Sequence, residues 1–272
     1  MLRKYSQHRS LNDNLKLGIL TAFVAGMINV SSLIIFFSFT SNVTGYYAIL
    51  AAEIVKGNFY QVLIVLSWIF LFFFGGFISN LIVISLNSKN TYIAHSLPIV
   101  LEIVCLIVVG VYGDFFYEET LRETEIMVAI MLFAMGLQNG LTASISNFSV
   151  KTTHLTGATT DLGILFSMLT KKRFRNNRAI TDKAKLIFSI FFSYVTGAIV
   201  ASYFFGIIRF KIFYVACLVL VIVLLYDFSK VRYFKFLVGC VGTYPNVLGM
   251  CDKGKNQEGS YCINALHVSI LW

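Results

Sequence analysis

Residues 136–163 read GLQNGLTASISNFSVKTTHLTGATTDLG, and the organisation of the whole chain can be worked out from this stretch. It starts in an apolar segment, passes through a region of Ser, Asn, Thr and His, and turns apolar again after Thr156-Gly157. A weaker copy lies earlier. Gly26-Met-Ile-Asn29 corresponds to Gly136-Leu-Gln-Asn139 at an offset of 110 residues, and Asn42-Val-Thr44-Gly45 corresponds to His154-Leu-Thr156-Gly157 at an offset of 112. Because the offsets agree so closely, we infer an internal duplication.

The composition is that of a membrane protein. Of the 272 residues 57% are hydrophobic and 13% are charged, whereas soluble domains are about 25% charged. Apolar runs of about 20 residues, the length that crosses a hydrocarbon core, recur along the chain. A transmembrane barrel would instead show alternating segments of roughly ten residues. We therefore predict an all-α polytopic protein in a lipid bilayer.

The net charge of +9 and the five cysteines indicate no further chemistry. Basic residues of membrane proteins collect in loops on one side, so we expect no nucleic-acid partner. Cys240, Cys251 and Cys262 lack the short paired spacing of a zinc site. No nucleophile–base pair, metal-ligand cluster or phosphate loop can be recognised. The sequence thus predicts no cofactor, no metal site and no enzymatic activity.

The duplication divides the membrane part into two repeats of about three spans each. Each repeat has one long span, a polar break with a short apolar piece (45–55 or 155–169), and two further long spans. Small residues spaced by four, as in Gly18, Ala22 and Gly26, mark faces where helices approach closely. The expected parts are a cytoplasmic N-terminal segment (1–14), a first repeat (15–113), an acidic loop (114–125), a second repeat (126–230) and a poorly ordered tail (231–272).

The sequence is compatible with two numbers of membrane spans. If the short pieces do not cross, the chain has six spans; if they do, it has eight. Both arrangements place 18 basic residues inside and 4 outside, with the N-terminus inside. Length favours six, because an apolar piece of 10–14 residues is more typical of a re-entrant segment. Three spans per repeat require the second repeat to insert upside down, as in many secondary transporters.

Three acidic residues in or near apolar sequence are candidate site residues. Glu102 lies in the middle of a predicted span, where it can serve as a proton or cation site or can be a neutral acid bonded to a neighbouring helix. Glu53 and Asp161 fall on comparable faces of the two short helices, about 40° apart at 100° per residue. Together they would suit a cation, unless they face water at a helix end.

Polar residues around the two breaks form the second candidate set. Thr44-Gly45 and Thr156-Gly157, with Asn42 or His154 upstream, can cap the short helices and leave their N-termini facing a cavity, which suits an anion or carboxylate. Simple capping is the alternative. Asn29, Gln138 and Asn139 can bind a ligand or join helices through hydrogen bonds.

The pairing of Gly136-Leu-Gln-Asn139 with Thr153-His-Leu-Thr-Gly157, and the earlier Asn42-Val-Thr-Gly45, resembles the YoaK-like family of bacterial inner-membrane proteins, a domain of unknown function. The resemblance covers about residues 15–230. It implies about six spans in the bacterial cytoplasmic membrane and brings no substrate. The first copy departs from the family pattern because Tyr46-Tyr47 follow the Thr-Gly pair.

These patterns favour a small-molecule or ion transporter with its site between the two repeats. A non-transporting scaffold or regulatory protein, in which the duplicated motifs are packing seams, is the alternative. A homo-oligomer is compatible with both.

Overall fold

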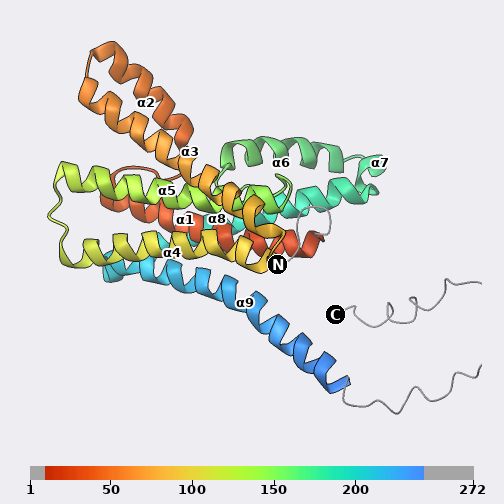
Figure 1. Ribbon diagram of the computed structural model, residues 1–272. Coiled ribbons are helices and arrows are strands. Elements are labelled where there is room, and N and C mark those ends of the chain that lie inside the picture. The colour runs from red at the N-terminus through yellow and green to blue at the C-terminus, as the bar shows by residue number, and fades with distance from the viewer. Residues whose placement is uncertain (1–9, 242–272) are drawn as a thin grey trace, which may run out of the picture. The chain divides into compact units, whose positions relative to one another are not determined.

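The computed structural model describes residues 10–241 and the side chains of residues 10–226. The chain divides into two units, Met1–Ser229 and Lys230–Trp272, and the packing below is that of the first. Residues 10–241 contain helices and no strand, so the predicted all-α class is confirmed. The elements (Figure 1) are α1 (Leu11–Phe36), α2 (Val43–Lys56), α3 (Phe59–Asn87), α4 (Thr91–Phe115), α5 (Leu121–Ile145), α6 (Leu155–Leu169), α7 (Lys172–Arg175), α8 (Arg178–Ile208), the 3-10 turn η2 (Arg209–Lys211) and α9 (Ile212–Val241).

Five stretches of the described chain are long and apolar enough to cross a bilayer. Four are single helices, α1, α3, α4 and α5, and the fifth, Arg178–Tyr226, contains α8, η2 and the start of α9. The chain is therefore a polytopic membrane protein by helix length and composition. The short helices α2 and α6 have 14 and 15 residues, fewer than the roughly 20 that a crossing requires.

One predicted boundary differs from the structure, and local capping explains it. The acidic loop is shorter than 114–125, because Thr120 and Glu123 form a capping box that starts α5 at Leu121. The second unit begins at Lys230, next to the predicted start of the tail at residue 231, although α9 itself continues to Val241. The rest of that tail, 242–272, and residues 1–9 lie outside the described chain.

Two helix pairs approach so closely that their backbones touch. A Cβ atom on Gly26 of α1 would collide with the carbonyl oxygen of Tyr194 in α8, and one on Gly197 of α8 would collide with that of Phe23 in α1. Gly26 is one of the three small residues, with Gly18 and Ala22, that were predicted to mark a close-approach face. Only glycine permits this distance, because any side chain would separate the two backbones.

The same contact is repeated between α3 and α5. A Cβ atom on Gly136 would collide with the carbonyl oxygen of Phe72, and one on Gly75 would collide with that of Phe133. In both pairs a glycine of one helix lies against the backbone three residues before the glycine of the other. These two contacts fix α1 to α8 and α3 to α5 and so frame the bundle.

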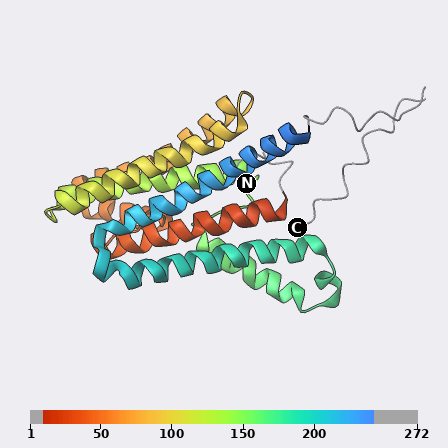
Figure 2. The ribbon, with the colours of Figure 1, turned by 90° about the horizontal axis from the view of Figure 1, so that it is seen from below.

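The short helices are held more loosely than the long ones. α2 packs against α3 and α6 packs against α8, as Figure 2 shows for α6 beside α8. α2 buries only Tyr46, and α6 buries only Leu162 and Leu165. A Cβ atom on Gly157 or Gly163 of α6 would have no described neighbour within 4 Å. Each short helix thus buries only one or two of its own side chains.

The close approach gives a direct test. Gly136→Ala should lower the midpoint of thermal unfolding in detergent, because the added methyl overlaps the Phe72 backbone and overpacking costs about 1–3 kcal/mol. Gly163→Ala is the matched control on α6, where space is open, and should leave the midpoint unchanged or raise it slightly. Equal losses in the two variants would contradict the packing described above.

Candidate functional site

A cavity of about 310 Å³ lies where the two polar breaks of the sequence meet. Residues 41–44, at the start of α2, line one part of it, and residues 153–156, at the start of α6, line another. Asn29 of α1, Phe72 of α3 and Tyr194 of α8 complete most of the wall. The tertiary structure therefore brings together five sequence candidates: Asn29, Asn42, Thr44, His154 and Thr156.

Asn29 anchors the segment that leads from α1 to α2. Its Oδ1 accepts hydrogen bonds from the backbone N–H of Thr40 at 2.9 Å and from the hydroxyl of Ser41 at 3.0 Å. Its Nδ2 donates to the hydroxyl of Tyr194 at 2.7 Å. A returning segment inside a membrane protein exposes backbone polar groups that lipid cannot satisfy. One buried amide satisfies part of this segment and ties it to α8.

Gln138 and Asn139 play the corresponding part for the segment that leads from α5 to α6. Asn139 Oδ1 accepts from the Thr152 hydroxyl at 3.0 Å, and Gln138 Nε2 donates to the carbonyl oxygen of Thr21 at 2.7 Å. Asn139 follows Asn29 by 110 residues, and Thr152 follows Thr40 by 112. Neither Gln138 nor Asn139 lines the cavity itself. They support it from α5.

The two anchors differ because only the first has a tyrosine hydroxyl as a partner. Asn139 Nδ2 and Gln138 Oε1 are buried without a hydrogen-bond partner among the described residues, whereas Asn29 Nδ2 has the Tyr194 hydroxyl. Tyr194 lies three residues before Gly197, and Phe72 lies three residues before Gly75, so Phe72 holds the corresponding place on α3. Phe72 carries no hydroxyl. The α5 side of the site thus keeps an open donor and an open acceptor.

The N-termini of the two short helices also differ. Asn42 caps α2, since its Oδ1 accepts from the Gly45 N–H at 3.2 Å. His154 holds the N-cap position of α6 but makes no side-chain cap hydrogen bond. Of the residues predicted to cap these helices, Asn42 does so, whereas Thr44 and Thr156 lie inside the first turns and do not cap. The first N–H groups of α6 therefore lack a side-chain cap at the edge of the cavity, where the positive end of the helix dipole lies.

The cavity lining carries polar groups and few formal charges. No Asp, Glu, Lys or Arg is among the described residues that line it, and His154 is its one imidazole. Hydroxyl and amide groups, with an uncapped helix N-terminus, complement a small polar molecule that bears an acceptor such as a carboxylate. The acidic candidates lie elsewhere.

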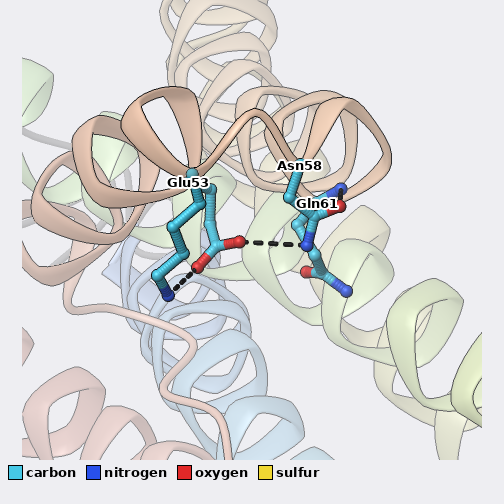
Figure 3. A network of polar contacts seen from close by, with 4 residues as sticks. Glu53, Asn58 and Gln61 are labelled. Atoms are coloured by element: carbon cyan, nitrogen blue, oxygen red, sulfur yellow. Dashed lines mark hydrogen bonds and ion pairs between the residues drawn. The ribbon is translucent and has the colours of Figure 1, made fainter.

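Glu53 stabilises the turn between α2 and α3. Its carboxylate accepts hydrogen bonds from Nζ of Lys56 at 2.6 Å and from Nδ2 of Asn58 at 3.0 Å. Figure 3 shows the contact between Glu53 and Asn58. Asn58 in turn caps α3 by accepting from the Gln61 N–H at 3.4 Å. The hydrogen bond from Lys56 holds the pKa of Glu53 below its usual value. Glu53 does not line the cavity.

Asp161 faces a second, larger groove of about 460 Å³ between α6 and α8. Its carboxylate lies 3.5 Å from Nζ of Lys183, and Gly157 lines the same groove. Gly45, unlike Gly157, lines neither space. His154 lines both the groove and the cavity, so it stands at the border between them.

Glu102 is fully buried in α4, at 0% exposure. Neither carboxylate oxygen has a hydrogen-bond partner among the described residues. The neighbouring helix is α9, whose Cys217 thiol donates to the carbonyl of Ile103 at 3.7 Å. An unpaired carboxylate in such a place would cost several kcal/mol, so the fold accommodates the neutral acid. The structure thus gives Glu53, Asp161 and Glu102 separate surroundings rather than one shared site.

Several residues of the site were not among the sequence candidates, among them Thr40, Thr152, Tyr194 and Phe72. The two threonines could have been found from the sequence, because each stands two residues before Asn42 or His154 and the two are 112 residues apart, like Asn42 and His154. No sequence pattern marks Tyr194 and Phe72, since aromatic residues in long apolar spans are common and only packing brings these two to the cavity.

Two substitutions that remove or add a single hydroxyl group test the difference between the two anchors. Tyr194→Phe leaves Asn29 Nδ2 without its acceptor and should lower stability by about 1–3 kcal/mol, the cost of a buried unsatisfied group. Phe72→Tyr adds a hydroxyl at the position that corresponds to Tyr194, where it can accept from Asn139 Nδ2, and should be neutral or stabilising by about 1 kcal/mol. Thermal unfolding in detergent measures both. A loss in Phe72→Tyr as large as that in Tyr194→Phe would refute the correspondence.

Comparison with known proteins places the chain in a family. Residues 17–226 match the family described as "Protein of unknown function (DUF1275)", and the chain belongs to it. This agrees with the YoaK-like resemblance read from the Gly-Leu-Gln-Asn and His-Leu-Thr-Gly motifs. No curated protein and no solved structure matches the chain.

Proposed function

We propose that this member of the DUF1275 family transports a small polar molecule or an ion across the bacterial cytoplasmic membrane. In this proposal the chain contains two inverted repeats of three spans, the N-terminus is cytoplasmic, and the solute binds in the cavity between the starts of α2 and α6. The observation that carries the proposal is that cavity, because it joins the two duplicated breaks in one polar, largely uncharged space.

The recurring contacts support the duplication. The α1–α8 contact pairs Gly26 with the Tyr194 carbonyl, and the α3–α5 contact pairs Gly136 with the Phe72 carbonyl. Gly136 follows Gly26 by 110 residues, and Tyr194 follows Phe72 by 122. A duplicated chain in which the first helix of each repeat packs on the third helix of the other would give this pattern. The second offset is larger by 122 − 110 = 12 residues, so the second repeat holds 12 more residues between these two helices, and it is the geometry of the contacts that recurs.

Helix lengths support inversion of the second repeat. Since α2 and α6 are too short to cross, three long helices remain in each half: α1, α3 and α4, then α5, α8 and α9. An odd number of crossings reverses the orientation of the copy that follows. Inverted repeats with broken helices at their interface are a common plan of secondary transporters, and their sites lie near the midplane.

Cysteine-accessibility mapping tests this topology. On a version without the five native cysteines, single probes at Lys56, Glu119, Lys89 and Lys151 would be labelled in intact cells with an impermeant reagent. We expect Lys56 and Glu119 to react from outside, and Lys89 and Lys151 only after permeabilisation. Labelling of Lys89 and Lys151 from outside, with Lys56 protected, would establish eight spans and parallel repeats, and the midplane site would lose its support.

Transport itself is tested in proteoliposomes with a panel of labelled amino acids, other carboxylates and polyols. For a transported compound, Thr156→Val should lower uptake roughly tenfold, because one hydrogen bond to the solute is lost without change of shape. Thr170→Val is the matched control, since Thr170 ends the same helix outside the cavity. Equal uptake by Thr156→Val and the wild type would remove the cavity from the mechanism.

Glu102 is the candidate coupling acid, because a buried, unpaired carboxyl group in a span is energetically costly and is typical of a functional site. Glu102→Gln keeps the shape and cannot release a proton, so in the same assay it should abolish the response of uptake to an imposed pH gradient. A structural acid would instead leave that response intact.

A non-transporting scaffold is the alternative, because the glycine contacts and Asn anchors also serve packing. It predicts no uptake of any compound on the panel, and a partner that co-purifies in a fixed ratio.

A further inference from the structure

A groove of about 560 Å³ lies between the first turns of α3 and α5, apart from the cavity discussed above. α3 contributes Tyr60, Ile64 and Trp68 to it, and α5 contributes Arg122, Glu125 and Ala129. The proposed transport function uses none of these side chains.

Glu125 is the unusual member of the groove. It is only 6% exposed, and its Oε2 accepts a hydrogen bond from the Tyr60 hydroxyl at 2.6 Å. Trp68 Nε1 donates to the backbone carbonyl of Glu125 at 3.1 Å, which holds the indole beside it. The other carboxylate oxygen, Oε1, has no hydrogen-bond partner among the described residues. A half-satisfied carboxylate beside two aromatic rings is suited to an ammonium group.

Arg122 supplies the opposite charge one helical turn away. It stands three residues before Glu125, so both side chains lie on one face of α5. Arg122 is exposed and forms no ion pair with a described residue. A guanidinium presents several donors in a planar fork and is well matched to phosphate. The groove therefore offers an anion for an ammonium and a cation for a phosphate.

The position of the groove identifies the source of such a ligand. Tyr60 is the second residue of α3 and Glu125 the fifth of α5, and both helices are candidate spans. The polar end of the groove thus lies at a membrane–water interface, where Tyr and Trp are enriched. Ile64 and Ala129 continue the groove one turn further into the apolar part of each span. Lipid headgroups are the ammonium- and phosphate-bearing molecules of that region, and their chains extend inward.

We infer that this groove binds a zwitterionic phospholipid whose headgroup carries a primary ammonium. Its ammonium donates to Glu125, its phosphate accepts from Arg122, and an acyl chain lies along Ile64 and Ala129. Occupation by this lipid would satisfy the open oxygen of Glu125 and hold the ends of α3 and α5 together.

Native mass spectrometry of the full chain released from nanodiscs tests the site. The nanodiscs would contain equal amounts of phosphatidylethanolamine and phosphatidylglycerol. The wild type should retain phosphatidylethanolamine in preference, and Glu125→Gln should reduce that preference roughly tenfold, because the charge that attracts the ammonium is gone. Glu118→Gln is the matched control: Glu118 lies between α4 and α5, outside the groove, and the preference should persist.

Arg122→Gln provides a second variant at an exposed position, in case Glu125→Gln does not fold. It should lower retention of both lipids together, because both carry a phosphate. Equal retention of the two lipids by the wild type, or an unchanged preference in Glu125→Gln, would overturn the inference. Displacement of the bound lipid by soluble phosphoethanolamine alone would overturn the assignment to a membrane lipid.

Discussion

The fold depends on two backbone-to-backbone contacts that only glycine permits. Where Gly26 meets α8 and Gly136 meets α3, the main chains touch without side chains between them. In lipid, burial of apolar surface gives no advantage to helix association, so close packing has to supply it. These contacts bring the first helix of each half against a helix of the other half. Everything at the centre, including the cavity, is positioned by them.

The cavity exists because two chain segments return into the bundle after α1 and α5, and such segments need internal hydrogen-bond partners. Asn29 and Asn139 provide these partners from the long helices, through Thr40 and Thr152. Tyr194 completes the first anchor, while Phe72 leaves the second open. The two anchors thus use similar Asn and Thr residues but differ in their hydrogen bonding. A solute that binds there would meet its free donors and acceptors on the α5–α6 side.

The charged candidates show why a residue type alone does not define a site. Glu53 and Asp161 were expected on comparable faces of the two short helices, yet Glu53 pairs with Lys56 near the end of α2, and Asp161 lies near Lys183. A helical wheel gives the angle around one axis and says nothing of how two helices are oriented towards each other. Glu125, which the sequence presented as part of a loop, is buried because a capping box extends α5 around it.

The sequence by itself determined the membrane class, the long helices, the offset between the two halves and the chemical character of the breaks, since these depend on local composition and spacing. It also determined five of the residues that line the cavity, because they belong to the repeated motif. Only the tertiary structure decided that the two breaks meet, that Phe72 and Tyr194 close the cavity between them, and that the three acids do not join it. Those outcomes depend on which helices are in contact. The contacts of α3 with α5 and of α1 with α8 require two segments far apart in the chain, so the local sequence of one helix does not determine them.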